Sequence, residues 1–351
     1  MSCAGRCENR RTGSGKDDSG IDDVIRGAHK ALVARAFVAL SIPDCLGAQP
    51  MSLADLASAT KAKPAPLSRL LRGAMAAGLC TESSGRYELT ATGMALQSGA
   101  PGNAAGWLML TTAPWIVAAW QELAEAVRSG QASFPQVHDK DFWEYVAEHP
   151  TEAGAFAAAM TSGAAARAED LFSALNWSAS AVVVDVGGGQ GLLMARLLSL
   201  VPHLRGIVAD RAEVVTSPAQ LALDLGSRMT MVASDFFREV PPGGDVYVLS
   251  RILHDWPDRE AITILRCCHA AMKKGSRLCL LEQVAPESSQ CTQEEKFDLA
   301  SKDLNMLVLV GGQERTLPEY TRLLAAADLR VFAVHQRAAC DVIEAGPVVD
   351  A

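Results

Sequence analysis

Residues 181–191 read A-V-V-V-D-V-G-G-G-Q-G, and this stretch decides the fold. Its valine run predicts a parallel strand over 182–186, because a strand buried on both faces need not alternate apolar with polar residues. Apolar residues at helical spacing follow the last glycine, so the chain turns from strand to helix over glycines. Four residues of this turn are candidate ligand contacts: Asp185, Gly187, Gly189 and Gly191.

The glycine turn favours one kind of ligand. Such a turn brings backbone N–H groups and a helix N-terminus toward a ligand, and the missing β-carbons let the ligand lie against the main chain. A dinucleotide fingerprint needs G-x-G-x-x-G, but position 192 is Leu, so the spacing is G-x-G-x-G with an acid two residues before it. That form suits S-adenosylmethionine, which has no pyrophosphate. The alternative is a tight turn in an α/β sheet that binds nothing.

Two further strand ends carry chemistry that fits the same ligand. A ribose needs an acid about 20 residues beyond the turn, and Asp210 closes the strand predicted over 206–210. The strand predicted over 229–233 is followed by Asp235 and Phe236, which offer a carboxylate to the adenine amine and a ring to its face. Three successive strand ends therefore predict S-adenosylmethionine as the cofactor.

Strands and helices alternate beyond the glycine turn. Further strands are expected over 245–250, 278–284 and 330–336, with helices between most of them. This alternation predicts a doubly wound, mostly parallel sheet, in which ligands bind at the carboxyl ends of the strands. Four ionisable residues lie at those ends or in a loop that could reach them: His254, Asp255, Glu282 and Glu314.

The composition limits the possible functions. With 351 residues, 49% of them hydrophobic and 21% charged, the chain can form two domains with sizeable cores. A net charge of −8 without a basic block argues against a dedicated nucleic-acid binder. The nine cysteines are scattered and lack paired C-x-x-C spacing. We therefore expect free thiols, and neither a disulfide framework nor a metal site.

The N-terminus predicts no targeting segment. No apolar run is long enough to span a membrane, and residues 1–20 lack the apolar segment of a signal peptide. We expect a cytoplasmic protein that does not bind membranes. Residues 1–20 also have too little apolar surface to order themselves, so they are expected to be a disordered leader in which Cys3 and Cys7 are incidental.

Three helices are expected after this leader. A helical period runs from Ile21 to a break at Pro43, and further helices are expected over 51–60 and 66–79, the former with Ser52 as its N-cap.

Residues 80–90 then predict a hairpin around a Ser-Ser-Gly turn. Helices followed by a two-stranded wing form the winged-helix pattern, whose commonest use is DNA binding. The last helix offers only Arg69 and Arg72 as basic residues, so a surface for pairing with other helices is favoured.

Residues 101–175 are rich in tryptophan, phenylalanine and methionine, with helices expected over 104–126 and 142–160 and a break at Pro150. Such side chains usually fill irregular cores. The alternative is that some of them line a flat, apolar pocket for an aromatic substrate.

Several sequence strings stand out together: V-D-V-G-G-G-Q-G, S-D-F-F, S-R-I-L-H-D-W-P-D, L-L-E-Q-V, and D-L-N-M-L followed by G-G-Q-E-R-T. With them, residues 21–336 resemble the small-molecule O-methyltransferases of the plant caffeate and bacterial polyketide-tailoring type. The resemblance implies an α/β, Rossmann-like, doubly wound methyltransferase domain and an N-terminal, mainly α winged-helix domain that forms a homodimer instead of binding nucleic acid. The implied organisation is a leader over 1–20, the dimerisation domain over 21–100, a helical linker and substrate-pocket region over 101–175, and the S-adenosylmethionine domain over 176–351.

The resemblance also assigns roles to single residues. His254 matches the catalytic base, and Glu282 and Glu314 match the acids that flank and orient it. The implied cofactor contacts are Asp185, Gly187, Gly189, Gly191, Asp210, Asp235, Phe236, Ser250 and Arg251. The implied contacts to the aromatic acceptor are Phe156, Met160, Asp255 and Met306.

The chain departs from the plant members at two places. Ser250 stands where they have a lysine near the adenine, and residues 308–310 lack an asparagine that some of them place against substrate. The second departure disfavours plant phenylpropanoid acceptors.

The expected reaction is methyl transfer to a hydroxyl, most simply a phenol, of an aromatic secondary metabolite. A phenol titrates near 10, so at neutral pH it needs a base, and histidine has the nearest pKa. The alternatives are a family member that binds S-adenosylmethionine but catalyses decarboxylation, hydroxylation or rearrangement, and a ligand-responsive winged-helix regulator. Among single residues, Glu282 is expected to pair with His254, whereas Glu314 has Arg315 as an alternative partner.

Overall fold

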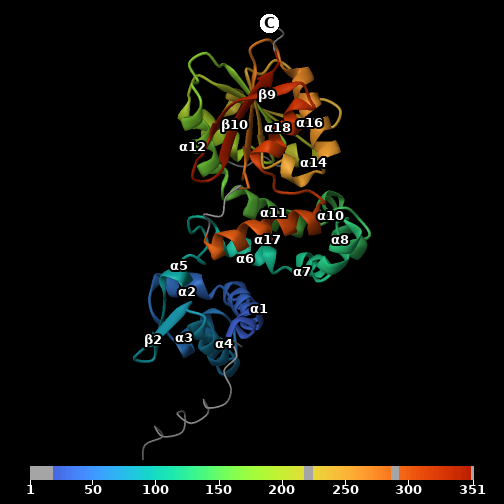
Figure 1. Cartoon of the computed structure of the whole chain (residues 1–351). Coiled ribbons are helices and arrows are strands. Elements are labelled where there is room, and N and C mark those ends of the chain that lie inside the picture. The colour runs from blue at the N-terminus through green and yellow to red at the C-terminus, as the bar shows by residue number, and fades with distance from the viewer. Residues whose placement is uncertain (1–18, 217–223, 286–291, 349–351) are drawn as a thin grey trace, which may run out of the picture. The chain divides into compact units, whose positions relative to one another are not determined.

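The structure is a computed structural model that describes residues 19–216, 224–285 and 292–348. The chain divides into two compact units, one up to Thr112 and one from Ala113 onward (Figure 1). The expected leader lies outside the described residues, except for Ser19 and Gly20, which begin the first helix.

The first unit is mainly helical. Its helices are α1 (Ser19–Ala39), α2 (Ile42–Ala48), α3 (Leu53–Ala59), α4 (Pro64–Ala76), α5 (Ala91–Met94) and α6 (Ala104–Thr111). Its antiparallel sheet has the order β1-β3-β2 and consists of β1 (Met51–Ser52), β2 (Cys80–Ser83) and β3 (Arg86–Leu89). The predicted wing hairpin is confirmed. The short strand β1, which adds a third strand to the wing, was not predicted.

Local sequence signals explain the helix ends in this unit. Ser52 is the N-cap of α3, as predicted, because its hydroxyl accepts a hydrogen bond from the Asp55 N–H at 3.2 Å. Pro43 does not mark the end of α1, which already stops at Ala39, and lies instead in the first turn of α2. Proline is tolerated there because an N–H at that position has no partner within the helix.

The second unit contains a seven-stranded sheet with the order β6-β5-β4-β7-β8-β10-β9. The strands are β4 (Val182–Val186), β5 (Arg205–Asp210), β6 (Met229–Ala233), β7 (Val246–Ser250), β8 (Arg277–Glu282), β9 (Leu329–His335) and β10 (Asp341–Pro347). Neighbours from β6 to β8 are parallel, whereas β10 runs antiparallel to β8 and β9. The predicted mostly parallel sheet is confirmed, but β10 was not predicted.

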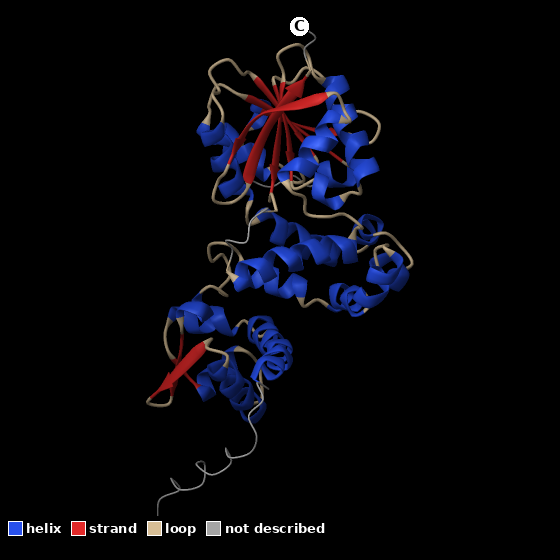
Figure 2. Cartoon of the chain, in the orientation of Figure 1, coloured by secondary structure: helices blue, strands red, loops and turns tan. Residues whose placement is uncertain are grey.

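Helices cover both faces of this sheet (Figure 2). Helices α12 (Ala164–Ala174) and α13 (Leu192–Leu200) pack on the face that carries Val183 and Val248. Helices α16 (Asp258–Ala271) and α18 (Leu317–Ala325) pack on the other face, against Val184 and Leu249. Successive residues of one strand therefore enter different cores, which explains why the central strands are apolar throughout.

A layer of helices precedes the sheet in sequence. It contains α7 (Pro114–Gln121), α8 (Leu123–Ser129), α9 (Phe134–His138), α10 (Phe142–Glu148) and α11 (Pro150–Thr161). Helix α17 (Gln293–Leu309) joins this layer from far along the chain and packs against α7, α8 and α9 (Figure 1). The Trp120 indole, for example, donates a hydrogen bond to Asn305 Oδ1 at 3.1 Å. Three aromatic residues of this layer are buried and pack against one another: Trp115, Phe134 and Phe142. For these three, packing in the core is the alternative that the structure supports.

The described residues contain neither a single membrane-spanning helix nor a disulfide bond. Only α1 and α2 taken together, across a bend of 62°, have the length and hydropathy of a membrane span. The described cysteines are free thiols: Cys45, Cys80, Cys267, Cys268, Cys279 and Cys340.

Two buried tyrosines give a test of how the sheet core is stabilised. Tyr247 and Tyr320 are both fully buried, but the Tyr247 hydroxyl donates to the Ala271 carbonyl at 2.7 Å and accepts from the Gly244 N–H at 3.1 Å. The Tyr320 hydroxyl has no partner among the described residues. Tyr247→Phe should lower the free energy of unfolding by about 1–3 kcal/mol, because it leaves buried groups unpaired, and Tyr320→Phe should be nearly neutral. Urea unfolding measures both, and equal losses would contradict this account.

Candidate active site

The glycine turn after β4 has the backbone that the sequence predicted. Gly187, Gly189 and Gly191 have φ angles of 71°, 58° and 79°, in the left-handed region where a side chain is strained. Gly188 has no room for a side chain either, because a β-carbon there would lie 2.6 Å from the carboxyl group of Asp185. The turn therefore presents bare backbone at the start of α13, as a ligand-binding turn requires.

Asp185 is a buried acid without a partner. It is only 1% exposed, and neither of its carboxylate oxygens forms a hydrogen bond within the described part of the chain. Burial, followed by the nearby Asp210 carboxylate, raises the pKa of Asp185 to about 7. Because an unpaired buried acid is costly, a cationic donor at this strand end would stabilise the site. The ammonium group of S-adenosylmethionine is such a donor.

Asp210 and Phe236 lie around the same turn. Asp210 accepts hydrogen bonds from the Gly189 N–H at 2.8 Å and the Arg211 N–H at 2.7 Å. Burial raises the pKa of Asp210 although these two bonds oppose the shift. The Phe236 ring lies 3.4 Å from where a β-carbon of Gly187 would be.

Asp235 is more exposed than these residues. Its carboxylate accepts from the Phe237 N–H at 3.0 Å and pairs with Arg238 at 3.4 Å. The three strand ends thus offer a bare turn, an unpartnered acid, a second acid and an aromatic ring, and these residues fit S-adenosylmethionine.

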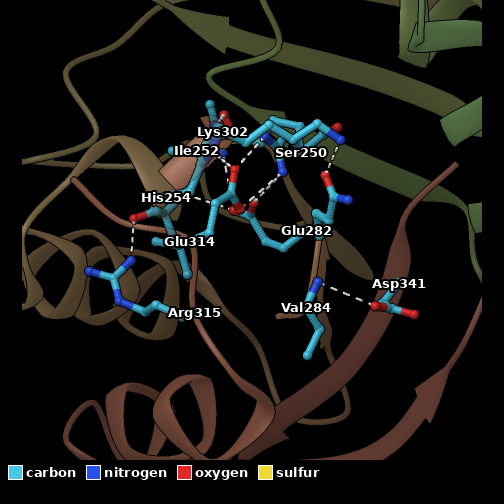
Figure 3. Close-up of polar contacts among 12 residues, drawn as sticks. Ser250, Ile252, His254, Glu282, Val284, Lys302, Glu314, Arg315 and Asp341 are labelled. Atoms are coloured by element: carbon cyan, nitrogen blue, oxygen red, sulfur yellow. Dashed lines mark hydrogen bonds and ion pairs between the residues drawn. The ribbon is translucent and has the colours of Figure 1, made fainter. Parts of the chain in front are cut away.

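His254 lies in a short 3-10 helix, η2 (Leu253–Asp255), directly after β7 (Figure 3). Its Nδ1 is 3.1 Å from Glu314 Oε1, and its Nε2 is 3.1 Å from the Arg251 carbonyl oxygen and 3.3 Å from Asp255 Oδ1. Both ring nitrogens face acceptors, which suits a protonated imidazole. Burial and Arg251 oppose protonation, but the acids Asp255, Glu282 and Glu314 outweigh them and raise the pKa of His254 above its usual value.

Glu314 holds two positive groups at once. Besides His254, it accepts two hydrogen bonds from the Arg251 guanidinium, at 2.8 and 3.3 Å. Burial alone would raise its pKa, but His254 and Arg251 lower the pKa of Glu314 to about 2. The alternative pairing with Arg315 is not found, because Arg315 pairs with Asp258 at 2.9 Å.

Glu282 binds the backbone next to the histidine, not its ring. The residue is fully buried at the end of β8, and its Oε1 accepts from the Ile252 N–H at 3.2 Å and the Leu253 N–H at 3.0 Å. The predicted pairing with the His254 ring is therefore wrong. Glu282 ends β8 beside the segment after β7, so its carboxylate binds main-chain N–H groups of that segment instead. Its charge still acts on His254 across the site.

Arg315 and Gly312 complete the support of η2, and sequence reasoning missed both as functional residues. The fully buried Arg315 donates to the carbonyls of Leu253 and Trp256, at 2.7 Å each (Figure 3). A β-carbon at Gly312 would come within 2.5 Å of the Asp255 backbone. Both residues belong to the G-G-Q-E-R-T string, but a sequence pattern does not show that this arginine points inward.

The candidate acceptor contacts lie on several elements. Phe156 on α11 packs against Phe142 and Trp143, with ring centroids 5.3 and 5.8 Å apart, and Met306 lies on α17. Burial raises the pKa of Asp255 to about 6 although His254 opposes it. Asp255 Oδ1 lies 3.3 Å from His254 Nε2.

Ser250 and Met160 share one partner, which sequence reasoning also missed. The Arg167 guanidinium on α12 donates from Nε to Ser250 Oγ at 3.1 Å and from Nη2 to the Met160 carbonyl at 3.3 Å. The structure thus joins the last residue of β7 to α11 through a partly buried cation.

Two sequence families match the chain. The O-methyltransferase domain family matches residues 120–330, and the O-methyltransferase dimerisation domain family matches residues 23–98. Among individual relatives, the mitomycin biosynthesis 6-O-methyltransferase of Streptomyces lavendulae is 34% identical over 89% of this chain and 88% of its own length. The aclacinomycin 10-hydroxylase of Streptomyces purpurascens is 33% identical over 85% of this chain and 80% of its own.

Solved structures agree with these matches. Mitomycin 7-O-methyltransferase has a TM-score of 0.86 at 32% identity, over 94% of this chain and 98% of that one. An O-methyltransferase from neocarzinostatin biosynthesis, in complex with S-adenosylmethionine and 2-hydroxy-5-methyl naphthoic acid, has a TM-score of 0.78 at 32% identity, over 91% and 96%. The family resemblance, the methyltransferase fold and S-adenosylmethionine as cofactor are therefore confirmed. This chain belongs to the O-methyltransferase family, with a dimerisation domain before its methyltransferase domain.

Proposed function

We propose that this enzyme methylates a phenolic hydroxyl of an aromatic small molecule and that His254 is the general base. The observation that carries the proposal is the His254–Glu314 pair at 3.1 Å, held beside the glycine turn. The Ile252 side chain, two residues before His254, lies against Gly187. The candidate base and the cofactor turn therefore belong to one site.

Glu314 sets the tautomer of the base. A carboxylate with a pKa of about 2 stays ionised and holds a proton on His254 Nδ1. When the ring is neutral, its Nε2 is therefore unprotonated and faces the Arg251 carbonyl and the Asp255 carboxylate, which are both acceptors. Neither can donate to it when Asp255 is ionised, so an acceptor hydroxyl becomes the favoured donor to Nε2.

The chain positions both reactants. S-adenosylmethionine, when bound, supplies an electrophilic methyl group. For its binding we propose Asp185, Gly187, Gly189, Gly191, Asp210, Asp235, Phe236 and Ser250. Arg251, which was also predicted to contact it, stays a proposed contact and in addition donates to Glu314 beside the base. Alignment of the acceptor oxygen with that methyl group contributes through proximity.

For the acceptor we propose an aromatic ring held by Phe156, Met160, Asp255 and Met306. Aromatic and thioether side chains make favourable contacts with flat rings. The neocarzinostatin enzyme, which was solved with a naphthoic acid, supports this class of acceptor.

The related aclacinomycin 10-hydroxylase makes hydroxylation a second candidate reaction. Mass spectrometry after incubation with S-adenosylmethionine and a panel of phenols, naphthols and naphthoic acids separates the two. Methyl transfer adds one methylene unit to the acceptor, whereas hydroxylation adds one oxygen atom. Hydroxylated products without methylated ones would contradict the proposed function.

Replacing His254 tests the base directly. His254→Ala should retain the fold and the affinity for S-adenosylhomocysteine while turnover falls by about 10²–10⁴, the usual contribution of a general base. Only the deprotonated ring accepts a proton, so wild-type activity should be lost as pH falls through the raised pKa of His254, above 6.5. Initial rates across pH measure this. Near-normal turnover of the variant at neutral pH would show that the acceptor arrives ionised or that alignment suffices.

Glu314→Gln is the matched control for this prediction. It keeps a hydrogen-bond acceptor beside Nδ1 but removes a charge that raises the pKa of His254. The midpoint of the pH profile should therefore move to lower pH, together with a loss of turnover. A purely structural role for Glu314 would leave that midpoint in place.

Replacing Asp210 tests where the ribose of the cofactor binds. Asp210→Ala removes the proposed acceptor for the ribose hydroxyls and should weaken S-adenosylhomocysteine by about 1–3 kcal/mol. The control is Glu213→Ala, an acid on the same segment that pairs with Arg211 at 3.2 Å, and it should leave the affinity unchanged. Calorimetry measures both. Equal affinities would place the ribose elsewhere.

We also propose that the enzyme is a homodimer through its N-terminal domain. The match of residues 23–98 to a dimerisation domain supports this proposal. Four apolar residues of α1 recur on one helical face and are more than half exposed: Ile21, Val24, Ile25 and Leu32. An exposed apolar stripe of this kind marks a protein interface.

Ile25→Asp should therefore shift the protein toward monomer in light scattering at micromolar concentration, because it places a charge within the stripe. The control, Lys30→Asp, changes another exposed position of α1 and should leave the dimer intact. A wild-type monomer would exclude the proposed dimer.

A further inference from the structure

Arg167 brings a positive charge to the carboxyl ends of the strands. Its Nε and Nη2 donate to the Ser250 hydroxyl and the Met160 carbonyl, which are both neutral. Its Nη1 lies over Gly163, where a β-carbon would collide with it. No carboxylate in the described ranges forms an ion pair with this guanidinium, and Nη1 has no hydrogen-bond partner there. A partly buried cation with a free donor is expected to bind an anion.

The strand order shows which part of the cofactor lies near Arg167. β4 carries the glycine turn and has β5 on one side and β7 on the other. Asp210 ends β5, and the proposed adenine contact Asp235 follows β6, one strand further out on the same side. With the ribose and adenine on that side, the amino-acid end of S-adenosylmethionine extends toward β7. There Ser250 ends the strand and holds Arg167.

The charges at this end match an amino acid. Among the described residues, Asp185 at the end of β4 is a buried acid without a hydrogen-bond partner, and Arg167 is a cation without a counter-ion. The two lie close enough for the charge of Arg167 to lower the pKa of Asp185, but they form no ion pair. An ammonium group beside Asp185 and a carboxylate beside Arg167 would satisfy both. That pair of groups is the zwitterion of the methionyl moiety.

We propose that Arg167 binds the carboxylate of the methionyl part of S-adenosylmethionine. The inference rests on the proposed function only in taking this cofactor as the ligand. Gly163 leaves space for the guanidinium, and Ser250 accepts a hydrogen bond from it. A bidentate contact would use Nη1 and Nη2, which an arginine presents in a fixed geometry.

Two ligands that differ only at the amino-acid end test this inference. S-adenosylhomocysteine carries the carboxylate, whereas 5′-methylthioadenosine lacks the whole amino acid. Arg167→Gln should weaken S-adenosylhomocysteine by roughly 10–100-fold, the loss of hydrogen bonds to a charged group, and should leave 5′-methylthioadenosine unchanged. The affinity of Arg167→Lys for S-adenosylhomocysteine should lie between those of the wild type and Arg167→Gln, because lysine keeps the charge but not the bidentate geometry. Isothermal titration calorimetry on the full chain measures the affinity of each ligand for the wild type and for both variants.

The control is Arg337→Gln. Arg337 donates to Ser173, near the other end of the helix that carries Arg167, so its loss should change neither affinity. Thermal unfolding of each variant checks the fold, and Arg167→Lys provides the comparison if Arg167→Gln does not fold.

Three results would overturn the inference. Unchanged affinity of Arg167→Gln for S-adenosylhomocysteine would exclude the contact. Equal losses for both ligands would show that Arg167 only supports the end of β7. Unchanged cofactor affinity with a raised KM for a carboxylate-bearing acceptor would assign Arg167 to the acceptor. A wild-type enzyme that binds neither ligand would instead contradict the assignment of S-adenosylmethionine as cofactor and with it the proposed function.

Discussion

Burial of the Glu282 carboxylate is the constraint on which the site depends. At the end of a strand covered on both faces, this fully buried acid needs donors, and it finds them in two consecutive backbone N–H groups, those of Ile252 and Leu253. The chain after β7 must therefore turn sharply over it. Arg251 makes that turn with a φ of 59°, which is costly for a residue with a side chain. Its bidentate contact to Glu314 compensates for this strain.

The other side of the same turn is held by a buried charge of opposite sign. Arg315 donates to the carbonyls of Leu253 and Trp256, so an acid holds the N–H groups of this segment while a guanidinium holds its carbonyls. His254 lies between these contacts and has little freedom to change its orientation. Removing the Glu282 carboxylate or the Arg315 guanidinium would leave backbone groups of this segment unpaired in the interior, and such losses are large.

The parts of this structure that follow from local pattern were predictable, and those that follow from tertiary pairing were not. A valine run and glycines identify β4 and its turn. Valine by itself indicates a buried strand, and glycine by itself indicates a backbone that other residues avoid. Strand β10 reads D-V-I-E-A-G-P, with a bulge between Glu344 and Ala345, so its buried residues do not alternate as in a regular strand. Arg167 and Arg315 were missed for another reason: their burial depends on elements far away in the chain.

The acids around His254 raise the pKa of its imidazole, and this shift has two opposing consequences for its use as a base. By raising the pKa of the imidazole they reduce the fraction that is deprotonated near neutral pH, but they also increase the affinity of that fraction for a proton. A phenol, which titrates near 10, loses its proton more readily to a base whose own pKa is raised toward that value. After transfer the ring is a cation, and Glu314, Asp255 and the Arg251 carbonyl already surround it with acceptors. The site is thus arranged for the protonated product of the base, which is the state that a proton-accepting histidine must stabilise.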